Sequence, residues 1–97
     1  MNSIRLSSKA AADLEDIGDY IARDNPSRAE TFVEELETAC TRIAENPRAY
    51  AARDSLVPGI RMAVYRHYLI FFRILDHEIR VERIVHGARH LPRLRTH

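Results

Sequence analysis

The sequence has one cysteine, three glycines and one lysine in 97 residues, and each scarcity excludes a class of site. A single cysteine, Cys40, cannot form an internal disulfide, which favours a reducing cytosol. Three scattered glycines do not make a glycine-rich phosphate loop. The longest apolar run, residues 69–72, is far too short to span a membrane, and residues 1–5 are too short for a signal peptide. We therefore expect a cytoplasmic protein with no cofactor.

The residues that are present suit one globular domain covering residues 1–97, with 45% apolar and 30% charged residues. The net charge of +1 hides an asymmetry. Residues 1–57 hold seven Lys and Arg against eleven Asp and Glu, whereas residues 58–97 hold eight Arg against three acids and all five histidines. This asymmetry indicates either an acidic partner or acidic helices that pair with a basic sheet. Residues 58–97 contain arginine but no lysine, which favours recognition of an acidic partner, because a guanidinium binds carboxylate or phosphate in a bidentate manner.

Two amphipathic helices are predicted in the first half of the chain. Ser7 or Ser8 caps the first, whose apolar residues recur at helical spacing from 10 to 21. Asn25-Pro26 starts the second helix, and Asn46-Pro47 ends it. The apolar face of the second helix consists of Ala29, Val33, Leu36, Cys40 and Ile43, widened by Phe32 and Ala44.

Strands are predicted at residues 2–6, 60–65, 68–75 and 79–85, with a loop over residues 47–57 and a tight turn at Asp76-His77. The predicted fold is α+β in the order β-α-α-β-β-β, a helical hairpin packed on one face of a small antiparallel sheet. The strand 68–75 is apolar on both faces, but the two helices cover only one face of the sheet. Some apolar surface should therefore remain for a partner.

No side-chain set indicates an enzyme clearly. Acidic residues between positions 13 and 19 suit a solvated helix face, and Cys40 suits a buried thiol. His86 and His90 lack further ligands at metal-binding spacing, so no metal site is expected. The one dense reactive cluster is Arg83, His86, Arg89 and His90. It could cleave RNA by binding phosphate and moving a proton, or it could be a basic edge that docks an acidic partner, and composition does not separate the two.

In their order and spacing, several segments resemble the ParE branch of the RelE/ParE toxin superfamily along nearly the whole chain. The matching pieces are Leu6-Ser7, Ala11, Asp13-Leu14, Ile17, Tyr20-Ile21-Ala22, Asp24-Asn25-Pro26, Ala29, Pro58-Gly59-Ile60-Arg61, Tyr68-Leu69-Ile70-Phe71-Phe72-Arg73 and Arg83-Ile84-Val85-His86-Gly87-Ala88-Arg89.

The resemblance implies the toxin component of a type II toxin–antitoxin system, held inactive by a ParD-like antitoxin whose C-terminal segment wraps the toxin. ParE toxins poison DNA gyrase without catalysis, whereas RelE-like toxins cut mRNA on the ribosome. The RelE-like residues are mostly absent: Leu69 follows Tyr68 where those enzymes carry arginine, Lys9 is the only lysine, and no later tyrosine exists. A gyrase inhibitor is therefore favoured.

The alternative is a RelE-like, ribosome-dependent mRNA endonuclease that uses His86, Arg89 and His90. Two binding surfaces are predicted. For the antitoxin they are Tyr20, Phe32, Arg61, Arg73 and Arg83, and for the cellular target Arg89, His90, Leu91, Arg93, Leu94 and Arg95. Contact with DNA is expected only through the antitoxin, and no contact with a membrane is expected.

Overall fold

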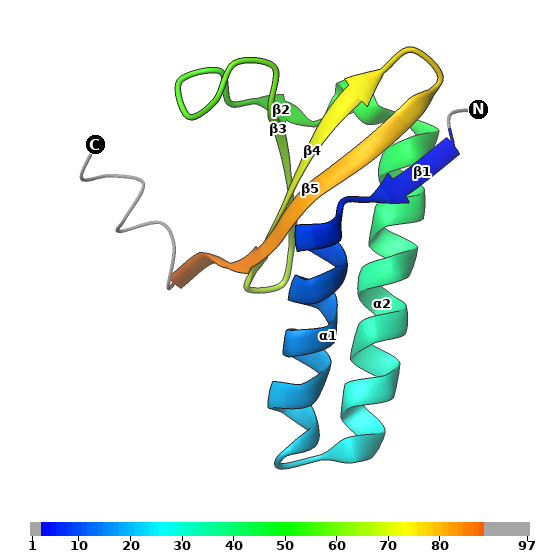
Figure 1. Cartoon of the computed structure of the whole chain (residues 1–97), viewed down its shortest axis with the longest axis vertical. Coiled ribbons are helices and arrows are strands. Elements are labelled where there is room, and N and C mark those ends of the chain that lie inside the picture. The colour runs from blue at the N-terminus through cyan, green and yellow to red at the C-terminus, as the bar shows by residue number, and fades with distance from the viewer. Residues whose placement is uncertain (1–2, 89–97) are drawn as a thin grey trace.

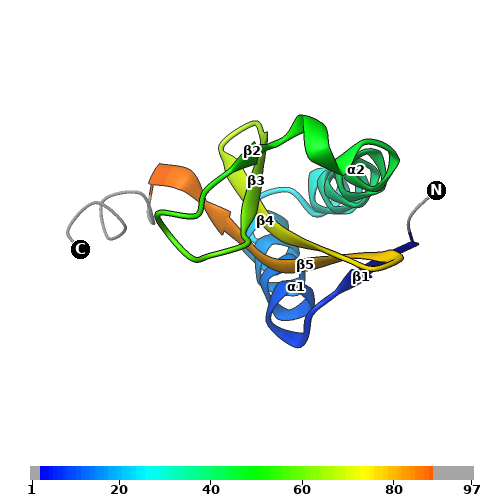
Figure 2. The same cartoon turned by 90° about the horizontal axis from the view of Figure 1, so that it is seen from above.

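The computed structural model describes residues 3–88 as a five-stranded sheet with a helical hairpin packed on one face (Figure 1). The elements are β1 (Ser3–Leu6), α1 (Ser8–Ala22), α2 (Pro26–Glu45), a 3-10 turn η1 (Pro47–Ala49), β2 (Ala51–Ala52), β3 (Arg61–Tyr65), β4 (Tyr68–Leu75) and β5 (Glu78–His86). The strand order is β1-β5-β4-β3-β2. The sheet is twisted, so the direction of the strands rotates from one edge of the sheet to the other (Figure 2). The α+β class and the predicted order of helices and strands are confirmed.

Both helices begin where the sequence predicts. The Ser7 side chain accepts a hydrogen bond from the Ala10 N–H at 3.0 Å, and the Asn25 side chain accepts one from the Arg28 N–H at 3.1 Å. Each cap satisfies a backbone N–H that has no partner within its own helix. Pro26 at the first position of α2 has no N–H to satisfy. Capping therefore fixes where each helix begins, and Asn25 also marks the end of the short link between them.

The sheet is mixed, so the prediction of an antiparallel sheet is wrong for one pair of strands. β1 pairs with β5 in parallel, with Ile4 opposite Ile79 and Leu6 opposite Val81, while the other pairs are antiparallel. The helical hairpin and three strands separate β1 from β5 in the chain, so no local turn signal sets their direction. β2 was also missed: it has two residues within the predicted loop and pairs only with Arg61 and Met62.

The hydrophobic core lies between the helices and one face of the sheet. Leu36 and Ile43 of α2 pack in the same cluster as Ile70, Phe72 and Val81 of the sheet, and all five are almost completely buried. Because side chains alternate along a strand, the neighbouring residues of β4 lie on the other face. The helix face of the sheet is thus filled, and the opposite face carries the remaining apolar residues of β4.

The hairpin is longer than the strands it covers. In Figure 1 its far end, around the link between α1 and α2, extends past the lower end of the sheet. Tyr20 lies in the last turns of α1 and is 56% exposed. No helix within residues 3–88 has the length and apolar character needed to cross a membrane.

Candidate functional site

The sheet face turned away from the helices, called here the open face, contains an apolar hollow of about 310 Å³. Leu69 pairs with Val85 across β4 and β5, and Phe71 pairs with Arg83, which places these side chains on the open face. The loop before β3 closes one side of the hollow. The lining consists of Leu56, Val57, Ile60, Phe71, Arg73, Glu82, Arg83 and Val85. The leftover apolar surface predicted from the sequence is confirmed at this place.

Two arginines, Arg73 and Arg83, line the hollow, and together with Arg80, which bonds to Glu82, they outnumber the acids beside them. A bulge in β5 between Val81 and Arg83 gives Glu82 no partner on β4. The Glu82 carboxylate accepts hydrogen bonds from Arg73 Nε at 3.1 Å and from Arg80 Nη2 at 3.1 Å. One carboxylate therefore serves two guanidinium groups, and the local charge stays positive. Such a surface suits an acidic partner segment with apolar anchors.

Arg83 is held from the helix side. Its guanidinium donates two hydrogen bonds to the Asp13 carboxylate of α1, which also accepts the Ile84 N–H at 2.9 Å. These hydrogen bonds raise the pKa of Arg83 above its ordinary value, although desolvation acts against them. The Arg83 side chain is still 44% exposed, so it remains available at the rim of the hollow.

The structure brings together only part of the predicted antitoxin-binding set. Arg73 and Arg83 both line the hollow, whereas Tyr20 is exposed on α1 and lines a separate depression that Arg83 also borders. Arg61 donates to the Tyr50 carbonyl at 2.7 Å and so anchors the chain before β2. The residues of the hollow that the sequence did not indicate are Leu56 and Val57, whose only signal is two apolar residues in a predicted loop.

Phe32 is a core residue, so its prediction as an antitoxin contact is wrong. Its side chain is 5% exposed and lies against the rings of Tyr65 and Tyr68, with centroids 6.0 and 5.5 Å away. The helical pattern placed Phe32 at the edge of an apolar stripe, but the turn between β3 and β4 brings both tyrosines over it. Burial leaves almost no surface for a partner.

The reactive cluster is only partly within the described residues. His86 lies edge-on to the Tyr68 ring at 5.2 Å and stacks with His67 at 6.0 Å. Arg89 and His90 lie outside residues 3–88, as do all the predicted target-binding residues. Within the described range there is no group of three or more His, Cys, Asp or Glu side chains placed to hold a metal ion.

Cys40 is buried on the apolar face of α2, as the sequence predicts. Burial raises the pKa of the Cys40 thiol to about 11, and the nearby Glu37 carboxylate adds to the shift. A thiol with this pKa is protonated at neutral pH and is a poor nucleophile. The side chain therefore contributes packing to the core.

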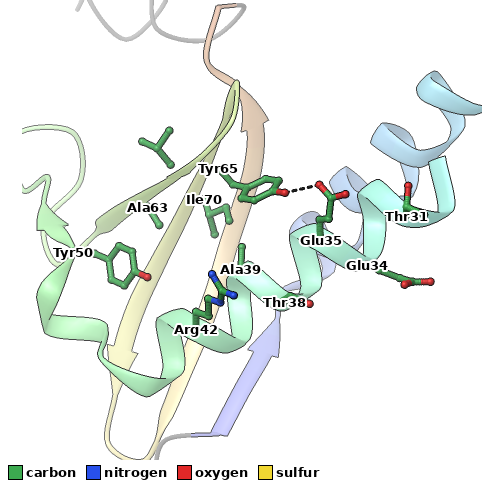
Figure 3. Close-up of a pocket in the computed structure, with 11 residues that line it drawn as sticks. Thr31, Glu34, Glu35, Thr38, Ala39, Arg42, Tyr50, Ala63, Tyr65 and Ile70 are labelled. Carbon is green, nitrogen blue, oxygen red and sulfur yellow. Dashed lines mark hydrogen bonds between the residues drawn. The ribbon is translucent and has the colours of Figure 1, made fainter. Parts of the chain in front are cut away.

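A second hollow, called here the α2–β3 groove, lies between α2 and the edge of the sheet and has a volume of about 530 Å³ (Figure 3). Glu35 closes one end of it, accepting hydrogen bonds from the Tyr65 hydroxyl and from Arg28 Nη1 at 2.6 Å. The bonds from Arg28 and Tyr65 lower the pKa of Glu35 to about 2. Arg42 and Tyr50 lie at the other end of the groove.

Comparison with known proteins gives consistent matches. A family model described as "ParE toxin of type II toxin-antitoxin system, parDE" matches residues 4–91. The chain is 36% identical over 83 residues to a protein named Toxin ParE1 from Mycobacterium tuberculosis, covering 84% of this chain and 85% of the relative. It is 33% identical over 91 residues to Toxin ParE1 from Caulobacter vibrioides, covering 91% and 92%.

The fold also matches a solved structure. A chain in the structure titled "Chromosomal ParDE TA system from P. aeruginosa" superimposes with a TM-score of 0.79 at 29% sequence identity. The match covers 89% of this chain and 96% of that chain. The arrangement of two helices on a mixed sheet is therefore shared with that protein.

Proposed function

Because the chain belongs to the ParE toxin family of type II toxin–antitoxin systems, we propose that it inhibits DNA gyrase by binding and is neutralised by a ParD-like antitoxin. ParE toxins are generally not catalytic. The proposed action is a protein–protein contact in the cytoplasm, where gyrase and its DNA are found, and the toxin touches DNA only through its antitoxin.

The observation that supports an antitoxin partner is the apolar hollow on the open face. Exposed apolar surface on a small domain commonly marks an interaction site. The hollow combines the aromatic ring of Phe71 with Arg73 and Arg83 at its rim, and aromatic and arginine side chains dominate binding energy in protein interfaces. An antitoxin segment with apolar residues flanked by acids would complement this surface. Tyr20 could extend the contact along α1 if the segment wraps around the hairpin.

The proposed gyrase-binding segment is the set Arg89, His90, Leu91, Arg93, Leu94 and Arg95, which alternates basic and apolar side chains. Leucines exposed to water without a partner have an unfavourable hydration free energy, and arginines bind carboxylates in a bidentate manner. The segment therefore has the composition to bind an apolar notch edged by acids on the target. Its position in the chain, after β5, keeps it separate in sequence from the residues of the hollow.

The alternative activity, RelE-like mRNA cleavage with His86, Arg89 and His90, is less well supported. His86 lies among the rings of Tyr68 and His67, so two aromatic side chains occupy much of its surroundings. A base that acts on the ribose 2′-hydroxyl needs open access to the substrate within hydrogen-bond distance. Binding without catalysis is the simpler function for this arrangement.

Expression in growing bacteria tests the proposal. The chain expressed alone should arrest growth, and co-expression with its cognate ParD-like antitoxin should restore growth. Messenger RNA isolated from arrested cells should be intact. Arrest that the antitoxin does not relieve would contradict the assigned partner, and rapid loss of mRNA before DNA supercoiling changes would favour the ribonuclease alternative.

A further inference from the structure

The outer edge of β3, beside the α2–β3 groove, is paired over only part of its length. β2 pairs with β3 only at Arg61 and Met62, so no strand within residues 3–88 pairs with the outer side of β3 at Val64. The Val64 side chain is 63% exposed, the most exposed large apolar residue in the described part of the chain. An unpaired strand edge presents N–H and C=O groups that can bond to another extended segment.

The register of the sheet places the Val64 backbone groups on this edge. The Ile60 carbonyl accepts a hydrogen bond from the Arg53 N–H at 2.8 Å, so the backbone of Ile60 faces the β2 side. In an antiparallel sheet the direction of these groups repeats every second residue, which brings those of Met62 and Val64 to the same side. The backbone N–H and C=O groups of Met62 point towards β2, whereas those of Val64 point to a position that β2 does not reach.

The path along this edge is blocked at one end. β2 runs antiparallel to β3 with Ala51 opposite Met62, so the preceding residue, Tyr50, lies across from Ala63. Tyr50 is anchored there, because its carbonyl accepts a hydrogen bond from Arg61 and its ring packs edge-on against Phe72 at 5.8 Å. A segment that pairs with Val64 therefore has to end or turn away at Tyr50. A second copy of this chain does not fit, because its own β3–β4 turn would occupy the position of β2.

Arg42 favours a carboxyl end over an amino end at the position where Tyr50 closes the strand edge. Its side chain lies at the same end of the groove as Tyr50 and Ala63 (Figure 3). None of the ion pairs within residues 3–88 involves Arg42, whereas Glu35 at the opposite end is paired with Arg28 and Arg66. A segment antiparallel to β3 arrives here with its carboxyl end, and a parallel segment would begin here with an amino group that Arg42 repels. The groove thus suits a carboxylate.

We propose that the α2–β3 groove captures the free C-terminus of the antitoxin, whose last residue pairs with the backbone of Val64 and whose terminal carboxylate binds Arg42. This inference rests on the proposed function, since it specifies a second contact of the same partner. The last residue of the antitoxin shares the open face with the Val64 side chain, so an apolar residue is favoured there. The residue before it enters the groove beside Thr38 and Tyr65.

The test compares the cognate antitoxin, ending as encoded, with the same protein carrying a Gly-Ser-Gly-Ser extension. Isothermal titration against the full-length chain should give a loss of affinity of about tenfold or more for the extended antitoxin, because its carboxylate is displaced. Arg42→Gln should cause a similar loss with the native antitoxin and little further loss with the extended one, because both changes remove the same interaction, the bond between Arg42 and the terminal carboxylate. Arg48→Gln, an exposed arginine outside the groove, is the matched control and should leave affinity unchanged.

Hydrogen exchange gives a second measurement that does not depend on a variant. The Val64 amide should exchange more slowly in the complex, and Val64→Pro, which removes that donor at an edge position, should weaken binding without unfolding the sheet. Antitoxin that binds tightly but leaves Val64 exchange unchanged, and is insensitive to both the extension and Arg42→Gln, would overturn this inference and leave the proposed function intact. Failure of the unmodified antitoxin to bind the unsubstituted chain would overturn the proposed function itself.

Discussion

Asp13 on α1 and Arg83 on β5 form a bidentate ion pair, with Nε to Oδ2 at 2.7 Å and Nη2 to Oδ1 at 2.9 Å. β1 accompanies β5 only as far as Val81, and beyond that point no strand within residues 3–88 pairs with this side of β5. Asp13 replaces that strand by accepting the Ile84 N–H, and the Ser7 hydroxyl donates to the Glu82 carbonyl at 2.8 Å. The start of α1 thereby caps the edge of the sheet and fixes Arg83 at the rim of the apolar hollow.

Asp13→Asn should lower the free energy of unfolding by about 1 kcal/mol. The amide keeps the size of the side chain but loses the charge that strengthens the bonds to Arg83, and partial exposure of the pair limits the loss. Urea denaturation measures the change. Asp16→Asn, an exposed carboxylate on the same helix, is the control. Equal stability of the two variants would show that the ion pair does not hold α1 to β5.

Glu35 should make the protein sensitive to acid. Its pKa is lowered from 4.5 to about 2 in the folded state, so the unfolded state binds a proton more readily. The stability that Glu35 contributes is present above pH 4.5 and is lost as the pH falls towards 2. Urea denaturation between these pH values should therefore give a shallower pH dependence for Glu35→Gln than for the unsubstituted chain.

Glu34→Gln provides the matched control for that experiment, because Glu34 is the exposed neighbour of Glu35 on α2. This variant should retain the steep loss of stability in acid. If Glu34→Gln and Glu35→Gln flatten the curve equally, the bonds from Arg28 and Tyr65 to Glu35 are not the cause.

The open face should carry much of the antitoxin affinity. Val57 lines the hollow and is 44% exposed, so Val57→Asp can be made with little cost to folding. A carboxylate at this apolar anchor point should weaken antitoxin binding by about 2 kcal/mol, or roughly thirtyfold in the dissociation constant. Titration calorimetry measures the loss. Ala12→Asp, on the exposed side of α1, should bind as the unsubstituted chain does, and an equal effect at both positions would rule out the hollow as the antitoxin site.

Deleting residues 90–97 should abolish toxicity and leave folding and antitoxin binding largely intact. The leucines and arginines of this segment are proposed to bind the target, whereas the described core and the hollow lie before it in the chain. Arg89→Lys and Arg93→Lys should each reduce toxicity, because lysine keeps the charge and loses the bidentate geometry. Growth arrest after induced expression is the readout. A truncated chain that binds antitoxin and still arrests growth at full strength would move the toxic surface elsewhere.

Local signals in the sequence predicted the helices and hairpins well. Ser7 and Asn25 act as caps through hydrogen bonds to residues only three positions away, and the turn at Asp76-His77 joins adjacent strands. Such features depend on neighbouring residues, so their patterns are visible in the sequence. The two-faced apolar pattern of residues 68–75 likewise indicated an uncovered face of the sheet, and the hollow lies there.

Long-range pairing was not predictable in the same way. Asp13 and Arg83 are 70 residues apart, and the parallel pairing of β1 with β5 has no local signal. Phe32 was misassigned because its burial depends on Tyr65 and Tyr68, which reach it only when the sheet folds against α2. The groove beside Val64 depends on where β2 stops, and two alanines carry too little pattern to predict that strand.

Supercoiling of relaxed plasmid by purified gyrase tests most directly whether the chain acts by binding gyrase. The full-length chain should inhibit supercoiling at concentrations comparable to that of gyrase, because a binding inhibitor acts stoichiometrically and does not turn over. Addition of antitoxin in excess should restore supercoiling, and ribosome-bound mRNA incubated with the same preparation should stay intact. Undiminished supercoiling at a large excess of chain that arrests growth, together with cleavage of the mRNA, would contradict gyrase inhibition and identify the chain as a ribonuclease.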